Sequence, residues 1–234
     1  MFKLTIKSQD INCDRANMAL VDNKVFLCNS IEEIYIDVEE LKNDREKIKR
    51  RKTENKINKD EITHLITVTC TGISAPGLDL QVMEALELPN NIFRTSVHFM
   101  GCYAAIHALK LADAFCKNDK NAKVIVVCTE LCTLHFQKEN STDNITSSLL
   151  FGDGSAAVLV THDDDEHEGL RIKDFYSEVA FKGKKDMSWE LSSSGFLMTL
   201  SGYIPDLIEE DFNSLTENAL QHASYNKEDI SHWC

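Results

Sequence analysis

The sequence lacks the features that mark a membrane or nucleic-acid-binding protein. No apolar run approaches the ~20 residues that a membrane-spanning helix needs, and the start, MFKLTIKSQDINCD, has no apolar signal-peptide core. Basic residues are scarce, because 25 Lys and Arg face 38 Asp and Glu for a formal net charge of −13. A nucleic-acid partner would require a basic face. We therefore expect a soluble, cytoplasmic globular protein with neither a membrane nor a nucleic acid as its partner.

The cysteines also lack a pattern. The chain has 8 of them but no CxxC pair, and no matching Cys/His pair follows Cys128 and Cys132 at ligand spacing. Scattered cysteines fit reduced thiols better than a disulfide framework or a zinc site. The acidic cluster DDDEHE at 163–168 is typical of a hydrophilic hairpin end, with a metal site as the alternative. We expect neither a metal nor a bound cofactor.

The middle of the chain alternates strand and helix signals. A β-branched run at 62–70 and a helical segment at 78–88 precede an alternating strand at 90–99, a helix at 103–117 and an apolar strand at 123–130. This alternation favours a sheet with helices on its faces. The buried face of the helix at 103–117 is predicted to consist of Ala105, Leu109, Ala112 and Cys116.

The amino-terminal third is less regular. Segments 21–30 and 31–40 predict two short strands, or a strand and a helix. The charged run at 41–61 is interpreted as a solvated helix or loop, because acidic residues interrupt its basic ones.

Beyond Glu130 the periodicity changes. Residues 131–150 predict an irregular connection, 155–162 a buried strand and 170–181 an alternating strand. Residues 194–224 begin a second helical stretch, and the last three residues resemble the start of another buried strand.

One cysteine stands out by its context. In the run FMGCY, Cys102 follows a predicted strand and Gly101, and it precedes an alanine-rich helix. Gly101 permits the sharp turn that this corner needs. A thiol at the first turn of a helix lies near unpaired N–H groups and the positive end of the dipole, which lowers its pKa. Cys102 is therefore the predicted nucleophile, and a small buried thiol is the alternative.

Four motifs together carry a resemblance to a known family. They are VTCTGISAPGLDLQ, MGCYAA, VVCTEL and LLFGDGSAAV, and with them residues 61–234 resemble the chalcone synthase-like type III polyketide synthases of the thiolase superfamily. The resemblance implies an acyltransferase in which Cys102 takes an acyl group from a coenzyme A thioester. Malonyl-CoA is then decarboxylated, and its enolate condenses with the cysteine-bound acyl chain to give a polyketide. The expected substrates are acyl-CoA and malonyl-CoA.

The resemblance also implies which residues line the acyl cavity. Phe151 matches an aromatic gatekeeper at the cavity mouth, and Met198 stands where plant enzymes have a second gatekeeper phenylalanine, two residues from Phe196. Ordinary core packing is the alternative for these positions. The other implied substrate-binding residues are Cys70 and Cys132, where plant enzymes have threonine, His135, and Trp189, which replaces a glycine and would shorten the cavity.

The resemblance places two further catalytic residues after Trp233. They are the histidine of an HPGG motif and a later asparagine, and the given sequence ends at Cys234. His98, His107 and His135 do not occupy the position of the family's histidine, and we interpret them as satisfied structural histidines. The amino-terminal region, which in the family supplies basic residues to the coenzyme A phosphates, is abbreviated, so no coenzyme A-binding residue is assigned.

Three hypotheses remain open from the sequence. The chain is a fragment of an active type III polyketide synthase, or a catalytically inactive truncated homologue that acts as an interaction module. The third hypothesis is an enzyme resembling ketoacyl-acyl carrier protein synthase III. The LFGDG and SAPG loops argue against this third hypothesis.

The resemblance implies an α/β fold of the thiolase type. We expect a layered αβαβα arrangement whose first half is nearly complete and whose second half is truncated. The expected parts are an abbreviated, partly charged region at 1–60, the half with the nucleophile at 61–162, and the start of the second half at 163–234. Family members are homodimers in which the loop at 74–76 reaches toward the neighbouring subunit, so we expect a homodimer.

Overall fold

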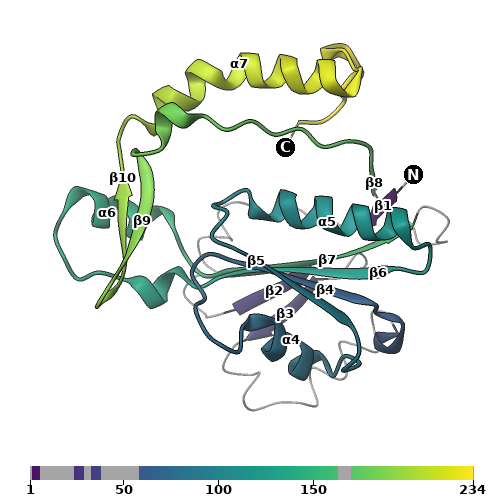
Figure 1. Ribbon diagram of the computed structural model, residues 1–234. Helices are drawn as coiled ribbons and strands as arrows, with labels where there is room; N and C mark the ends of the chain where they lie inside the picture. Colours follow the sequence, from purple (N-terminus) through teal and green to yellow (C-terminus); the bar gives the residue numbers. More distant parts are fainter. Residues whose placement is uncertain (1, 6–23, 29–32, 38–57, 163–169, 234) are drawn as a thin grey trace. The chain divides into compact units, whose positions relative to one another are not determined.

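The computed structural model describes residues 2–5, 24–28, 33–37, 58–162 and 170–233 (Figure 1). Contacts divide the chain into two compact units. The first unit comprises Met1–Thr133 and Gly152–Ile172, and the second comprises Leu134–Phe151 and Lys173–Cys234. The charged run at 41–57 and the acidic cluster at 163–168 lie outside the described residues.

The first unit is built on a six-stranded sheet with the strand order β5-β4-β6-β7-β1-β8. β4 pairs in parallel with β5 and β6, whereas β7 is antiparallel to β6 and β1, and β8 is antiparallel to β1. A separate antiparallel pair joins β2 and β3. The strand bounds are β1 Phe2–Thr5, β2 Lys24–Cys28, β3 Glu33–Asp37, β4 His64–Thr69, β5 Phe93–His98, β6 Lys123–Glu130, β7 Gly154–His162 and β8 Leu170–Ile172.

Burial on both faces explains the composition of the central strands. Strands that are covered on both sides read as continuous apolar and β-branched runs. In β4, all residues after His64 are buried. The strands predicted at 62–70, 90–99, 123–130 and 155–162 are confirmed, and for 21–40 the alternative of two strands is correct.

Helices cover both faces of this sheet. α4 (Leu78–Leu86) packs against Leu65, and α5 (Ala104–Asn118) packs against Ile66, the next residue of β4. Because successive side chains of a strand point to opposite faces, the two helices lie on opposite sides of the sheet (Figure 1). The first unit is therefore a layered α/β/α structure.

Two of the four residues predicted for the buried face of α5 are fully buried. Ala112 and Cys116 are buried as predicted, whereas Ala104 and Ala108 are buried in place of Ala105 and Leu109, which are only partly buried. The prediction is therefore correct for the second half of the face and off by one residue in the first half. Side chains this small allow the helix axis to approach the sheet closely.

The second unit contains a β-hairpin and two helices. β9 (Met187–Ser192) pairs antiparallel with β10 (Gly195–Leu200), and α7 (Ile204–Ala223) follows β10. α6 (Thr142–Leu150) contacts β10, where the Asp143 carboxylate accepts a hydrogen bond from the Leu200 N–H at 3.4 Å.

Short 3-10 helices occur in both units. They are η1 Lys59–Glu61, η2 Cys132–His135, η3 Phe181–Gly183 and η4 Lys227–Asp229.

Several predictions after Glu130 are wrong. Residues 131–150 contain η2 and α6, and the Ser141 hydroxyl caps α6 by accepting from the Asn144 N–H. Of 170–181, only Leu170–Ile172 form a strand. The helix expected within 194–224 begins at Ile204, after β10, with a proline in its first turn. Residues 231–233 form no strand, and Trp233 is 55% exposed.

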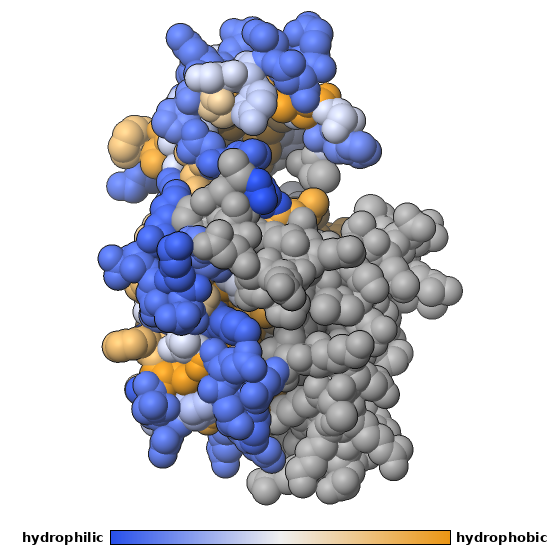
Figure 2. All heavy atoms as spheres, turned by 90° about the vertical axis from the view of Figure 1, so that its right-hand side faces the viewer, coloured by the Kyte–Doolittle hydropathy of each residue, from blue (hydrophilic) through white to orange (hydrophobic). Residues whose placement is uncertain are grey.

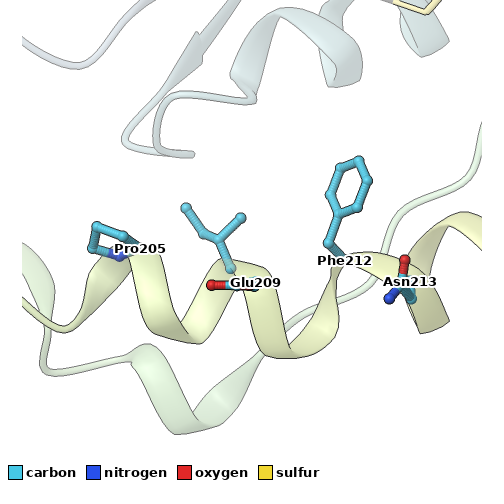
Figure 3. Close-up of a pocket in the computed structure, with 5 residues that line it drawn as sticks. Pro205, Glu209, Phe212 and Asn213 are labelled. Carbon is cyan, nitrogen blue, oxygen red and sulfur yellow. The ribbon is translucent and has the colours of Figure 1, made fainter.

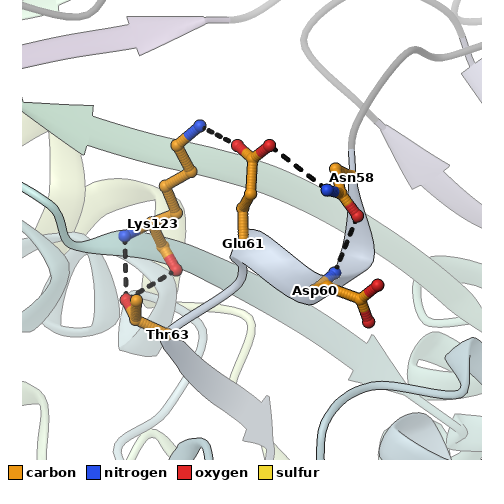
Figure 4. Close-up of polar contacts among 5 residues, drawn as sticks. All are labelled: Asn58, Asp60, Glu61, Thr63 and Lys123. Carbon is orange, nitrogen blue, oxygen red and sulfur yellow. Dashed lines mark hydrogen bonds and ion pairs between the residues drawn. The ribbon is translucent and has the colours of Figure 1, made fainter.

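Polar contacts fix the amino-terminal ends of β4 and β6 beside each other (Figure 4). The Thr63 hydroxyl donates to the Lys123 carbonyl at 3.1 Å and accepts from the Lys123 N–H at 2.8 Å. The Lys123 ammonium also pairs with the Glu61 carboxylate, and Asn58 accepts from the Asp60 N–H at 3.1 Å to cap η1. The register of the parallel pair is thus fixed by side chains as well as by the strand ladder.

The described surface carries both polar and apolar side chains. The face drawn in Figure 2 is mostly hydrophilic in its described part, with apolar side chains between the polar ones. Phe181 is exposed singly, which is normal for a folded protein, whereas Leu149 and Leu150 are adjacent exposed residues at the end of α6. None of the described helices is long and apolar enough to cross a membrane.

Thr63→Val tests the contact between β4 and β6. The substitution removes a hydroxyl that both donates to and accepts from the Lys123 backbone, so we expect the free energy of unfolding to fall by about 1–2 kcal/mol in urea denaturation. The matched control is Thr216→Val on α7, whose exposed hydroxyl donates to the Phe212 carbonyl. Its loss should stay within about 0.5 kcal/mol. Equal losses of stability for the two variants would show that the Thr63 hydroxyl does not hold β4 and β6 together.

Candidate active site

The predicted nucleophile lies in the turn between β5 and α5. Phe99 and Gly101 both take left-handed backbone conformations there, with φ of 59° and 80°. A Cβ on Gly101 would meet only the Tyr103 ring, at 3.8 Å, so it is the backbone conformation that favours glycine. The Ala104 N–H donates to the Gly101 carbonyl at 3.0 Å and closes the turn.

Cys102 is exposed and carries a free thiol. It lies two residues before the start of α5, and the N-cap residue, Tyr103, makes no side-chain cap hydrogen bond. The first N–H groups of a helix have no partner within the helix. Cys102 thus lies in the turn that leads into α5, at the corner between strand and helix.

Cys70 lies directly against this turn. It follows the last residue of β4, and its thiol donates to the Gly101 carbonyl across 3.9 Å. The thiol is buried, and burial raises its pKa, to which the negative charge of Glu130 adds. Cys70 therefore contacts the nucleophile turn as a protonated thiol.

Cys132 begins η2, directly after β6. The Asp153 carboxylate anchors this turn by accepting from the Thr133 N–H at 2.8 Å and from its hydroxyl at 2.6 Å. Burial first, and then the negative charges of Glu130, Asp153 and Cys102, raise the pKa of Cys132 to about 11.

Glu130, the last residue of β6, joins these turns and was not identified from the sequence. Its carboxylate accepts from the Cys70 N–H at 2.9 and 3.1 Å and from the Thr71 N–H at 3.0 Å, and it also accepts a short hydrogen bond from the Thr71 hydroxyl. The same hydroxyl accepts from the Leu131 N–H at 2.7 Å. The only signal in the sequence is a carboxylate at the end of an otherwise apolar strand.

The second unit holds the remaining predicted residues, and an aromatic stack joins two of them. The Phe196 ring lies 3.9 Å from the His135 ring at an interplanar angle of 13°, and 3.9 Å from the Trp189 ring at 20°. A stacked ring occupies one face of its neighbour, so His135 and Trp189 lie on opposite faces of Phe196. Phe196 is 5% exposed. The sequence interpretation set Phe196 aside, but its ring is the centre of the stack.

Hydrogen bonds hold this stack in place. The Phe196 N–H donates to Nδ1 of His135 at 3.3 Å, and the Gln137 amide donates to the His135 and Ser194 carbonyls, each at 3.1 Å. Gly195, with φ of 115°, brings its backbone so close that a Cβ would lie 3.2 Å from Nδ1 of His135. The β9–β10 hairpin is therefore held in place by hydrogen bonds between its backbone and the side chains of His135 and Gln137.

The other two residues predicted to line the cavity, Met198 and Phe151, also lie in the second unit. Met198 is the cross-strand partner of Trp189 in the β9–β10 ladder, and it is half-buried. Phe151 is the C-cap residue of α6, whose N–H donates to the Ser147 carbonyl at 2.9 Å, and it is also half-buried. The structure thus groups Cys70, Cys102 and Cys132 in the first unit and the other four residues in the second.

The three histidines that were interpreted as satisfied differ from one another. The His135 ring accepts a backbone hydrogen bond, as expected. For His98 and His107 the interpretation is wrong, because their Nε2 atoms are buried without a hydrogen-bond partner among the described residues. Their rings make edge contacts instead, His98 with Phe99 at 5.7 Å and His107 with Tyr103 at 4.7 Å between centroids.

A hollow of about 580 Å³ lies on α7 (Figure 3). Its lining includes the exposed apolar residues Ile208 and Phe212 and one carboxylate, Glu209, but no cysteine or histidine. The hollow thus offers no nucleophile. Within the part of the chain that the structure describes, no group of three His, Cys, Asp or Glu side chains is placed to hold a metal ion.

Comparison with known proteins identifies the family. The family described as chalcone and stilbene synthases, N-terminal domain, matches residues 27–164, more than half of the 234 residues. The chain belongs to the chalcone and stilbene synthase family. The predicted resemblance to type III polyketide synthases is thereby confirmed.

Relatives of this chalcone and stilbene synthase family member include known polyketide synthases. "Probable polyketide synthase 1" from Dictyostelium discoideum is 30% identical over 168 residues, which cover 71% of this chain and 5% of that protein. The C-terminal type III polyketide synthase domain of Steely1, a type I/III hybrid from Dictyostelium, matches with a TM-score of 0.68 and 27% identity, over 78% of this chain and 51% of that one.

A second solved structure supports the fold. PKS-I from the brown alga Ectocarpus siliculosus matches with a TM-score of 0.74 at 24% identity, over 81% of this chain and 51% of that one. The chain thus spans about half the length of these solved structures. The predicted α/β fold of the thiolase type is confirmed.

Phe196→Ala tests the aromatic stack of this chalcone and stilbene synthase family member. Removing the buried middle ring should lower the free energy of unfolding by about 3–5 kcal/mol in chemical denaturation. Saturating benzene should recover part of the loss, because a dry apolar cavity binds benzene.

The control for this variant is Leu197→Ala, the next residue of β10, which is 45% exposed. Its loss should stay within about 1 kcal/mol and should not respond to benzene. A similar loss for both variants would show that Phe196 is not the centre of the stack.

Proposed function

We propose that the chain is an acyltransferase of the type III polyketide synthase kind. It takes an acyl group from an acyl-CoA thioester onto Cys102 and extends it with malonyl-CoA by decarboxylative Claisen condensation. One observation carries the proposal, namely the exposed free thiol of Cys102 in the turn before α5. Membership of the chalcone and stilbene synthase family supports the class of reaction.

The first step is a thioester exchange. The Cys102 thiolate attacks the carbonyl carbon of the acyl-CoA, a bond to its sulfur forms, and the bond to the coenzyme A sulfur breaks. Coenzyme A leaves as a thiolate and takes a proton from water. The Ala104 and Ile106 N–H groups at the start of α5 already donate to the Gly101 and Tyr103 carbonyls, so the positive end of the helix dipole is proposed to stabilise the negative charge that develops on the carbonyl oxygen.

The second step builds the carbon chain. Malonyl-CoA loses carbon dioxide, and the resulting enolate carbon attacks the carbonyl of the acyl group on Cys102, which releases the cysteine thiolate. By resemblance, a histidine and an asparagine that follow Trp233 in the family hold the reacting oxygens. We assign the loading step to residues of this chain and the condensation step to this chain together with those two residues.

The acyl cavity is proposed from the resemblance alone. In the first unit, Cys70 is buried against the nucleophile turn, and Cys132 is half-buried at the start of η2. In the second unit, the proposed wall residues His135 and Trp189 are held by Phe196, so their rings are fixed in place. The indole of Trp189 shortens the cavity and favours a short or differently folded polyketide, with Phe151 and Met198 as gatekeepers.

We also propose that the chain forms a homodimer. β5 is the terminal strand of the sheet and pairs with β4 alone among the described strands. An edge strand presents unpaired N–H and C=O groups that a second copy can satisfy. Phe93 at the start of β5 is 70% exposed, although its ring stacks on His64 at 5.1 Å. We further propose that the protein acts in the reducing cytoplasm, where its free thiols persist.

Acyl loading is tested by intact-mass analysis and peptide mapping. Incubation with hexanoyl-CoA should add one hexanoyl group on the Cys102 peptide, and Cys102→Ala should abolish the addition, because the attacking sulfur is gone. Hexanoyl-acyl carrier protein serves as the comparison donor. Preferred loading from the carrier protein would favour the enzyme resembling ketoacyl-acyl carrier protein synthase III, and loading of Cys102→Ala would refute the nucleophile.

The dimer is tested by sedimentation velocity. Phe93→Lys places a charge on the open edge of β5 and should shift the protein from dimer toward monomer. Phe181→Lys, at a position that is 81% exposed in the second unit, is the control and should leave the dimer intact. A monomeric wild-type protein, or equal effects of both variants, would contradict this interface.

A further inference from the structure

The Glu130 carboxylate accepts from the Cys70 N–H and lies two residues from both Cys128 and Cys132 along the chain. The negative charge of Glu130 is a cause of the raised pKa of Cys70, Cys128 and Cys132. Cys70 contacts the carbonyl of the residue before Cys102, and Cys132 follows Leu131, whose N–H donates to the Thr71 hydroxyl at 2.7 Å. An acyl group that arrives at Cys102 therefore lies near the Cys70 thiol, which is chemically able to accept it, and Cys132 is tied to the same segment.

The carboxylate is held in a fixed position among these groups. Glu130 ends β6, and the segment Cys70–Thr71 follows β4, which is the parallel neighbour of β6. Both carboxylate oxygens accept the Cys70 N–H, and one of them also accepts the Thr71 N–H and hydroxyl. The same residue that carries the charge therefore also anchors the segment that touches the nucleophile turn.

We propose that Glu130 is a positioning residue that confines acyl transfer to Cys102. Its carboxylate holds the segment Cys70–Thr71 against the nucleophile turn, and its negative charge prevents Cys70 and Cys132 from competing for the acyl group. Glu130 itself exchanges no proton or bond with the substrate. This inference rests on the proposed loading of Cys102.

The electrostatics give the direction of the effect. A thiolate, not a thiol, attacks a thioester. The pKa of Cys132 is raised to about 11 by burial first, and then by the negative charges of Glu130, Asp153 and Cys102. A thiol with so high a pKa is almost entirely protonated at neutral pH. Removing the Glu130 charge lowers the cost of a second negative charge, so the pKa of Cys132 falls and its thiolate fraction rises.

The test compares the reactivity of each cysteine in the full chain. Wild type and Glu130→Gln are alkylated with iodoacetamide from pH 7 to 11, and each cysteine is quantified by peptide mass mapping. In Glu130→Gln the alkylation midpoint of Cys132 should move to lower pH, and its rate at pH 8 should rise roughly tenfold for each unit by which the pKa falls. With hexanoyl-CoA, acyl label should spread from Cys102 to Cys70 and Cys132.

Two matched variants separate the charge from the hydrogen bonds. Thr71→Val removes a donor to Glu130 and the acceptor for the Leu131 N–H but keeps the charge. If the charge is responsible, its Cys132 midpoint stays at the wild-type value. Glu84→Gln removes an exposed carboxylate from α4 and should change neither the midpoint nor the label distribution.

Three results would overturn the inference. They are an unchanged Cys132 midpoint and label distribution in Glu130→Gln, an equal shift in Thr71→Val, and, in wild type alone, alkylation of Cys132 at lower pH than Cys102. The wild-type result decides the matter if Glu130→Gln does not fold. Failure of hexanoyl-CoA to load Cys102, with the alkylation results as expected, would refute the proposed function while supporting the charge effect of Glu130.

Discussion

The parallel pairing of β4 with β5 and β6 is the constraint on which the candidate site depends. The carboxyl ends of parallel strands meet at one edge of a sheet, and loops at that edge form the usual site in α/β proteins. Cys70 follows β4, the turn to Cys102 follows β5, and Glu130 ends β6. Segments about thirty residues apart in the chain therefore converge without any local signal for contact between them.

The sequence was sufficient for those parts of the fold that depend on local patterns. The runs that became β4, β6 and β7 are long, apolar and β-branched, and the helix after Cys102 is rich in alanine. The glycine hinge at Gly101 and the position of Cys102 follow from the same local pattern. On α5, Ala104 and Ala108 are buried in place of Ala105 and Leu109, because periodicity gives the spacing of a face but not which of two adjacent residues packs against the sheet.

The remaining features depend on distant partners or on weak local signals. α6 begins at a serine cap within a polar segment that has little apolar periodicity, and β10 continues into α7 after three residues. Glu130 acquires its role from Cys70 and Thr71, which precede it by about sixty residues. The stack around Phe196 likewise joins residues of η2, β9 and β10, and no spacing in the chain predicts which of three aromatic residues lies between the other two.

The alanines on the buried face of α5 have a consequence for motion. Ala104, Ala108 and Ala112 are almost fully inaccessible and have no side-chain torsion through which the contact with the sheet can rearrange. These three positions cannot change rotamer, so α5 can shift against the sheet only if the facing strand side chains repack. The helix that starts beside Cys102 is therefore held against the sheet through contacts that offer few alternative arrangements.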